Sequence, residues 1–251
     1  MNSTDAMRVL MRNPERTGIF CDFDGTLADI VPLPADAWPV LGATDVLAQL
    51  ADSFRIVAIV SGRGLEDLRP RVDADGVVLA GSYGRERSDK ELTQTAVAWG
   101  WEGVVQKAVA RTTALHGVLV EPKEAGVALH YRSAPEHRDQ IREIASDLAR
   151  EFGLQIRPGR LVFELVVPGP GKAEAVVTLA GECGLDALLV AGDDAADVEA
   201  FEAVRSLDLE AVVVGIASSE APPGLAAASD IVLPDPSAFV EFLRELASAG
   251  D

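Results

Sequence analysis

The part of this sequence best suited to chemistry is the segment Asp22-Phe23-Asp24-Gly25-Thr26, which follows an apolar run. In an extended backbone Asp22 and Asp24 would point to the same side, because side chains alternate along a strand. Gly25 permits the turn that follows, and Thr26 adds a hydroxyl and a further backbone N–H. Two acids at the end of a buried strand, next to a turn, predict a site for a divalent cation and a phosphate.

Two plainer interpretations compete with a phosphate site. An EF-hand calcium loop that began at Asp22 would need a glutamate at its twelfth position, where this sequence has Leu33. The EF-hand interpretation is therefore excluded. A turn of solvated acids after a strand is not excluded by so short a motif, and the remaining motifs have to decide.

Further polar motifs follow other predicted strands. Ser61 follows the apolar run 55–60, and Asp193, Asp194 and Asp197 follow the run 187–191. Lys172 stands at a predicted helix start. In open parallel sheets, ligands bind beyond the carboxyl ends of the strands. Carboxylates from two such strands can hold one Mg²⁺, while Ser61 and Lys172 would bind the phosphate oxygens.

The order of the predicted elements indicates the fold class. In the first and last parts of the chain strands alternate with helices, as expected for a parallel sheet covered on both faces. The predicted strands there are 18–24, 55–60, 77–80, 187–191, 211–216 and 230–233, and the predicted helices are 42–51, 64–71, 172–183, 198–204 and 236–248. Between these parts lies a helix–hairpin–helix–hairpin pattern, with helices at 97–114 and 135–152 and β-like runs at 117–122, 126–132, 154–157 and 161–166. We therefore predict an α/β, doubly wound, Rossmann-like core of residues 1–90 and 169–251, with an α+β domain inserted at 91–168.

Composition limits the partners of this chain. Its formal net charge of −18 argues against nucleic acid and anionic membranes, and it means that a phosphate substrate needs a bound cation and local bases. No window reaches about 18 consecutive apolar residues and the start does not resemble a secretory signal, so we predict no membrane span. Cys21 and Cys183 are expected to be buried, reduced thiols of a cytoplasmic protein. The oligomeric state stays open, and a monomer is compatible with the sequence.

Taken in this order, the motifs resemble those of the haloacid dehalogenase superfamily of phosphotransferases, and the insertion resembles the larger, type-2 cap of that superfamily. Over nearly its full length the chain resembles the trehalose-6-phosphate phosphatases. The matching segments are Leu79-Ala80-Gly81-Ser82-Tyr83-Gly84-Arg85-Glu86, Val120-Glu121-Pro122-Lys123, Leu129-His130-Tyr131-Arg132, and Phe163-Glu164-Leu165 leading to Gly171-Lys172.

The resemblance implies roles for the predicted site residues. Asp22 would be the nucleophile that forms an aspartyl phosphate, and Asp24 would protonate the departing sugar oxygen and later accept a proton from water. Asp22, Asp193 and the main-chain carbonyl of Asp24 would bind Mg²⁺. Lys172 and Ser61 would orient the phosphoryl group. The supporting residues would be Gly25, Thr26, Asp194 and Asp197.

In the same resemblance the inserted domain provides specificity. The polar residues in its β-like runs would contact the sugar, and they are Glu121, Lys123, His130, Arg132 and Glu164. A solvated sheet face is the alternative for these residues, and for His130 a buried core position is another. The core would add Arg63, Tyr83 and Arg85 as substrate-binding candidates, although both arginines fit surface positions equally well.

Two segments depart from the family pattern. The family usually has histidine where this chain has Tyr83, and threonine and glutamate where it has Ala196 and Val198. The nucleophile and the metal ligands are retained despite these departures, so we predict a Mg²⁺-dependent phosphatase that hydrolyses trehalose 6-phosphate to trehalose and phosphate. The alternatives are a phosphatase for another disaccharide or a cyclitol-containing pseudo-disaccharide phosphate, a sugar phosphomutase, and a non-catalytic sugar-phosphate-binding module.

Overall fold

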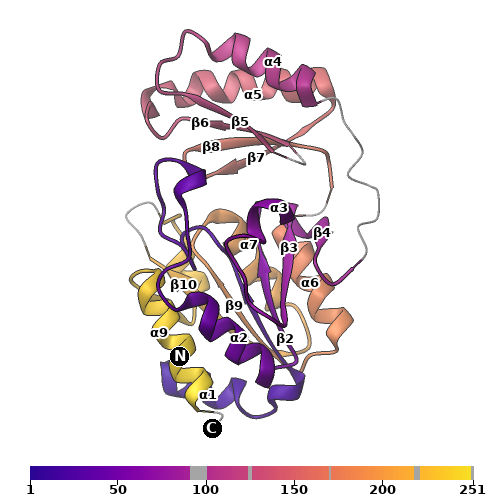
Figure 1. The fold of residues 1–251 in the computed structure, drawn as a ribbon, viewed down its shortest axis with the longest axis vertical. Helices are drawn as coiled ribbons and strands as arrows, with labels where there is room; N and C mark the ends of the chain where they lie inside the picture. The colour runs from indigo at the N-terminus through magenta and orange to yellow at the C-terminus, as the bar shows by residue number, and fades with distance from the viewer. Residues whose placement is uncertain (91–100, 124–125, 170, 218–220, 250–251) are drawn as a thin grey trace. The chain divides into compact units, whose positions relative to one another are not determined.

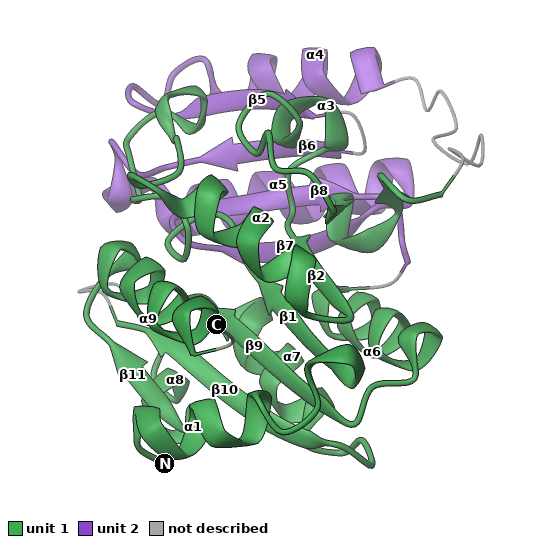
Figure 2. Ribbon diagram, turned by 60° about the horizontal axis from the view of Figure 1, so that its bottom comes forward, with its two compact units in different colours: residues 1–91, 170–251 green, residues 92–169 purple. Residues whose placement is uncertain are grey.

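A computed structural model of the chain describes residues 1–90, 101–123, 126–169, 171–217 and 221–249. The chain divides into two compact units (Figures 1 and 2). Unit 1 consists of residues 1–91 and 170–251, and unit 2 of residues 92–169. The start of the predicted helix 97–114 and part of the predicted return connection 168–171 lie outside the described residues. The role of the inserted segment as a specificity domain stays a prediction.

Unit 1 contains a seven-stranded sheet in the order β11-β10-β9-β1-β2-β3-β4, in which only the short β4 pairs antiparallel to its neighbour. Its strands are β1 (Thr17–Cys21), β2 (Ile56–Val60), β3 (Val77–Gly81), β4 (Glu86–Arg87), β9 (Ala187–Gly192), β10 (Glu210–Ile216) and β11 (Ile231–Leu233). Its helices are α1 (Ser3–Leu10), α2 (Ala43–Ser53), α3 (Leu65–Leu68), α6 (Lys172–Cys183), α7 (Ala195–Val204), α8 (Leu225–Ala228) and α9 (Pro236–Ser248). The predicted α/β fold class with a parallel sheet is confirmed.

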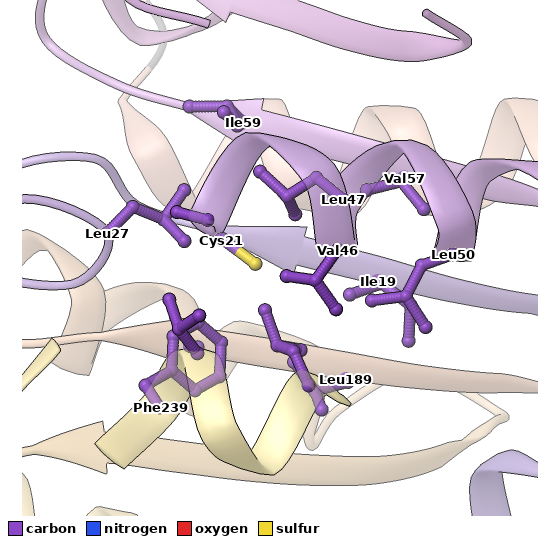
Figure 3. Close-up of a cluster of buried hydrophobic side chains, with 14 of the residues drawn as sticks. Ile19, Cys21, Leu27, Val46, Leu47, Leu50, Val57, Ile59, Leu189 and Phe239 are labelled. Carbon is purple, nitrogen blue, oxygen red and sulfur yellow. The ribbon is translucent and has the colours of Figure 1, made fainter. Parts of the chain in front are cut away.

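Alternate side chains of the central strands build a separate core on each face of this sheet. Ile19 and Cys21 of β1 pack with α1, α2 and α9, whereas Phe20 packs with α6, α7 and α8. Figure 3 shows the first core, where Leu47 of α2 and Phe239 of α9 gather around β1 and β9. Each fully buried aliphatic or aromatic side chain of this kind contributes about 1.5–3 kcal/mol. The sheet is therefore doubly wound, and β1 lies at its centre.

The end of β1 differs from the sequence prediction. The strand ends at Cys21 rather than at residue 24, and the chain turns back at once. The backbone N–H groups of Leu27 and Ala28 both donate to the carbonyl oxygen of Phe23, at 2.9 and 3.0 Å. Asp22 remains bound to the sheet because its N–H donates to the carbonyl of Ala191 in β9 at 2.9 Å. Asp22 and Asp24 therefore do not share one face of a continuing strand.

The described residues of unit 2 form a four-stranded antiparallel sheet with two helices on one face. The strands, in the order β5-β6-β8-β7, are β5 (Leu119–Lys123), β6 (Gly126–His130), β7 (Gln155–Gly159) and β8 (Val162–Val166). The helices are α4 (Trp101–Thr112) and α5 (Arg138–Phe152). Leu129 and Leu165 pack against Ile141 of α5, so this face is apolar and the other face carries the polar side chains.

Two other sequence predictions can be compared with the described residues. None of their helices is both long and apolar enough to span a bilayer. Cys21 is buried as expected, but Cys183, near the end of α6, is only partly buried, so that expectation was wrong. Both cysteines are free thiols.

Candidate active site

Three carboxylates meet at the carboxyl ends of β1 and β9. Asp22, Asp193 and Asp197 each place an oxygen within 4.8 Å of the others. Asp22 is 6% exposed, and Asp193 and Asp197 are each 1% exposed. Asp22 follows β1, Asp193 follows β9, and Asp197 lies in the first turn of α7. The parallel pairing of β1 with β9 therefore brings together acids that are far apart in the sequence.

Lys172, the first residue of α6, lies between two of these acids. Its Nζ donates to Oδ1 of Asp22 at 2.6 Å and to Oδ1 of Asp197 at 2.9 Å. Burial by itself would lower the pKa of Lys172, but the negative charges of Asp197 and Asp22 outweigh that effect and raise this pKa. Lys172 is therefore a permanently charged cation in a site that is otherwise acidic.

Asp197 holds the loop between β9 and α7. Its Oδ2 accepts hydrogen bonds from the N–H groups of Asp193 at 3.0 Å and Asp194 at 3.1 Å. Asp194 caps α7 in return, because its Oδ1 accepts from the N–H of Asp197 at 2.9 Å. A methyl group added to Gly192 would lie 2.0 Å from Cγ of Asp197, so only glycine fits there. This reciprocal cap explains why α7 begins at Ala195, earlier than the predicted residue 198.

The turn after β1 also approaches the acids closely. Gly25 has a φ of +83°, and a methyl group added to it would lie 2.2 Å from Oδ2 of Asp193. The Asp193 carboxylate therefore lies directly against the backbone that follows Asp24. In the same turn Thr26 is fully buried, and its Oγ1 has no hydrogen-bond partner among the described residues. A buried hydroxyl without a partner is unfavourable, and it suits a turn that receives a polar ligand.

The chemistry of this donor set fits a divalent cation. Burial raises the pKa of Asp22 to about 7, and the negative charges of Asp194 and Asp193 add to this effect while Lys172 opposes it. A hard cation stabilises buried acids that otherwise repel one another, and Mg²⁺ prefers oxygen ligands of this kind. Asp22 and Asp193 would hold the cation, with the main-chain carbonyl of Asp24 as the predicted third ligand. Asp197 is close by, but its two oxygens are used by Lys172 and by backbone N–H groups.

The side chain of Asp24 has a different partner. The guanidinium of Arg63 donates from Nε to Oδ2 and from Nη2 to Oδ1 of Asp24, both at 2.7 Å. Arg63 is only 7% exposed, and it also bonds to Asp67 of α3 and to the carbonyl of Pro34. Neither the ion pair between Arg63 and Asp24 nor the bond from Arg63 to Asp67 was predicted, because nothing in the sequence links positions 24 and 63. Substrate binding by Arg63 stays a prediction, but the geometry makes Arg63 the group that fixes Asp24.

The remaining core candidates lie in two neighbouring loops. Ser61 follows β2, is buried, and accepts a hydrogen bond at its Oγ from the N–H of Arg63 at 3.2 Å. The N–H of Tyr83 donates to the carbonyl of Ser61 at 2.9 Å, which brings the loop after β3 beside the loop after β2. Arg85, two residues on, is partly buried. Ser61, Arg63 and Tyr83 therefore form one group in unit 1.

The polar face of the unit 2 sheet carries the other candidates. Nε2 of His130 lies 2.7 Å from Oε2 of Glu121, and Lys123 forms an ion pair with Glu164. Arg132 follows β6, and its Nη2 lies 3.5 Å from the carbonyl of Arg160. His130 is therefore only partly buried, and its ring has a hydrogen-bond partner.

Arg157 was missed by the sequence reasoning. It pairs in register with Glu164 across β7 and β8, so it shares the polar face of the unit 2 sheet. The only signal was its position in the β-like run 154–157, which alternates between polar and apolar residues.

Comparisons with known proteins agree with this fold and these motifs. A family model described as "Trehalose-phosphatase" matches residues 20–230. A trehalose-phosphate phosphatase of Mycobacterium avium is 36% identical over 244 residues, which cover 91% of this chain and 61% of that protein. A structure titled as the C-terminal domain of the C. albicans trehalose-6-phosphate phosphatase matches with a TM-score of 0.82 at 21% identity, covering 99% of this chain and 97% of that one.

A haloacid dehalogenase-like hydrolase of Bacteroides thetaiotaomicron also matches, with a TM-score of 0.62 at 13% identity, covering 92% of this chain and 99% of that one. This match shows that the two chains share a fold. The chain spans about three fifths of the length of the M. avium relative, 61%. The family resemblance seen in the sequence is confirmed as well: the chain belongs to the trehalose-phosphatase family.

Proposed function

We propose that this protein is a Mg²⁺-dependent phosphatase that hydrolyses trehalose 6-phosphate to trehalose and phosphate through an aspartyl-phosphate intermediate. The observation that carries the proposal is the buried carboxylate of Asp22, which lies at the end of the central strand, 2.6 Å from Lys172 and beside Asp193. Supporting it, the family is named for this activity, and relatives such as the M. avium protein bear that name.

The reaction divides into two displacements at one carboxylate. An oxygen of Asp22 forms a bond to phosphorus, and the bond from phosphorus to the sugar oxygen breaks. Asp24 enters the first step protonated, with one of its oxygens released from Arg63, and gives that proton to the departing sugar oxygen. It then takes a proton from the water that displaces phosphate from Asp22. Lys172 and Ser61 hold the phosphoryl oxygens. When bound, the cation offsets the repulsion between the carboxylate and the phosphate and stabilises the charge of the transition state.

The proposal extends to the sugar and to the setting of the enzyme. The polar face of the unit 2 sheet offers carboxylates, a lysine and a histidine, which match the hydroxyl groups of a disaccharide. The net charge of −18 opposes an anionic substrate, so recognition depends on Lys172 and the bound cation. Free cysteines fit a cytoplasmic location.

A second candidate has one observation in its favour. Tyr83 occupies the position where the family usually has histidine, and it adopts a left-handed conformation beside Ser61. A phenol is bulkier than an imidazole and has no charge change near neutral pH. A phosphatase for another disaccharide phosphate, or for a cyclitol-containing one, therefore remains the alternative, with the same chemistry at Asp22.

Phosphate release from a panel of sugar phosphates tests both candidates. The panel is run with Mg²⁺, with a chelator, and with Asp22→Asn as the control. We expect release that depends on Mg²⁺, is strongest for trehalose 6-phosphate, and is abolished in the folded Asp22→Asn protein. A preference for another member would select the second candidate. No release from any member by folded wild-type protein would refute a phosphatase.

A further inference from the structure

The turn that carries Tyr83 has an unfavourable backbone. Ser82 has a φ of 50° and Tyr83 a φ of 59°, and Gly84 follows with a φ of 83°. Two consecutive residues with a Cβ are rare in this left-handed region, because each clashes with its own carbonyl oxygen. Such a conformation persists only where the surroundings hold it, and it occurs most often at functional sites.

Glu86 provides the contacts that hold this turn. It is 5% exposed, and its carboxylate accepts one hydrogen bond from the hydroxyl of Ser82 and one from the N–H of Leu65, the latter at 2.9 Å. Leu65 is the first residue of α3, at the end of the loop that follows β2, whereas Ser82 follows β3. One buried carboxylate therefore joins the two loops.

The joined loops carry residues of the proposed site. The N–H of Ser82 donates to the carbonyl of Arg63 at 2.7 Å, and the N–H of Tyr83 donates to that of Ser61 at 2.9 Å. The phenol of Tyr83 lies over Gly62, where an added methyl group would be 2.8 Å from the phenol oxygen. The position of the Tyr83 ring relative to Ser61 is thus set by the strained turn.

We infer that Glu86 is a positioning residue that fixes Tyr83 beside Ser61 by holding the turn in its left-handed conformation. The inference rests on the proposed function for its catalytic consequence, because Tyr83 affects KM only if it binds the substrate, as the family resemblance implies. Nothing in the proposed reaction requires Glu86 to touch the substrate. Its effect is transmitted through Ser82, and its loss releases the turn rather than removing a reacting group.

The first experiment compares Glu86→Ala with Ser88→Ala. Ser88 is a matched control in the same hairpin, because its Oγ accepts from the N–H of Leu79, a residue of β3 outside the turn, at 2.9 Å. We expect Glu86→Ala to raise KM for the sugar phosphate about 5- to 30-fold, the range that corresponds to the cost of one left-handed residue. In the same variant the amides of Ser82 and Tyr83 should exchange hydrogen faster. Ser88→Ala should change neither quantity.

The second experiment tests whether Glu86 acts on Tyr83 through the conformation of the turn. Adding Ser82→Gly to Glu86→Ala frees the backbone for a positive φ, so it should reverse most of the rise in KM. Ser82→Gly alone should have a KM close to that of the double variant, because both lack the bond from Ser82 to Glu86 and both have a glycine in the turn. In a Tyr83→Ala background, Glu86→Ala should add no more than about a twofold effect, because the residue through which it acts is already gone.

Each result decides the inference. The inference would be overturned by unchanged exchange of the Ser82 and Tyr83 amides in Glu86→Ala, or by a KM that does not recover when Ser82→Gly is added. Fully additive changes in KM for Glu86→Ala and Tyr83→Ala would also overturn it. If Glu86→Ala does not fold, Ser82→Ala takes its place, since it removes the same bond and should produce the same changes to a smaller extent. If wild-type protein releases no phosphate from any sugar phosphate, the proposed function fails, but the amide exchange of Ser82 and Tyr83 still decides the role of Glu86.

Discussion

Substituting Gly25 by alanine should damage the acidic site without removing any carboxylate. Gly25 has a φ of +83°, and an added methyl group would lie 2.2 Å from Oδ2 and 2.4 Å from Cγ of Asp193. Gly184→Ala is the matched control, because Gly184 has a φ of +60° and nothing lies within 4 Å of an added methyl group. The control shares the cost of a left-handed alanine, about 1–2 kcal/mol, but not the steric clash.

The difference between the two variants therefore measures the clash on Asp193. Overpacking of a close contact costs about 1–3 kcal/mol, so Gly25→Ala should lower the free energy of unfolding by about 2–5 kcal/mol in total. Urea denaturation in the presence of a chelator gives both values. Titration with Mg²⁺ should then stabilise wild type and Gly184→Ala but not Gly25→Ala. Equal unfolding free energies for the two variants, together with an intact response to Mg²⁺, would refute the close approach of Asp193 to the turn.

Four further predictions concern other groups of the site. Arg63→Lys keeps the positive charge but loses the two-point bond to Asp24, so kcat should fall about tenfold, and the melting temperature should also fall because the buried guanidinium bonds to Asp67 and to the carbonyl of Pro34 as well; a wild-type kcat would show that Arg63 does not fix Asp24. Lys123→Met breaks the ion pair with Glu164, so KM for the sugar phosphate should rise while hydrolysis of p-nitrophenyl phosphate stays constant; equal losses on both substrates would contradict a role in sugar binding. Burial raises the pKa of Asp22 to about 7. The contribution of Asp22 to the unfolding free energy of the metal-free protein should therefore decrease as the pH rises from the ordinary pKa of an aspartate through about 7. Since protons compete with the cation for Asp22, the rise in melting temperature caused by Mg²⁺ should be larger at about pH 8 than at about pH 5.5, and a rise that is independent of pH would contradict this.

The sequence was most informative where the physics is local. Apolar runs and helical periodicity predicted the strands and helices of the parallel sheet. Because ligands bind beyond the carboxyl ends of such strands, Asp22, Ser61 and Asp193 could then be predicted to lie at one edge of the sheet. The two-residue strand β4 and the four-residue helix α8 were not predicted, because such short segments contain too little pattern.

What the sequence could not give were contacts across long separations. The direction of the Asp24 side chain depends on Arg63, and the end of β1 depends on hydrogen bonds of the following turn. The left-handed backbone at Ser82 and Tyr83 was also unpredictable, since neither residue type favours it and a buried glutamate holds it. The same reason explains why Glu86 was quoted within a motif but not named as a site residue.

The pairing of β1 with β9 has a consequence for how the protein is made. β1 lies between β2, which follows it closely, and β9, which is synthesised only after the whole of unit 2. A nascent chain that ends before residue 187 has one unpaired edge on its central strand and an acidic site that lacks Asp193 and Asp197. Loop-closure entropy delays such distant pairings, so the insertion makes completion of the sheet a late folding event. The acidic site should therefore be complete only after residues 187–197 have left the ribosome, and until then the unpaired edge of β1 is open to pairing with other chains.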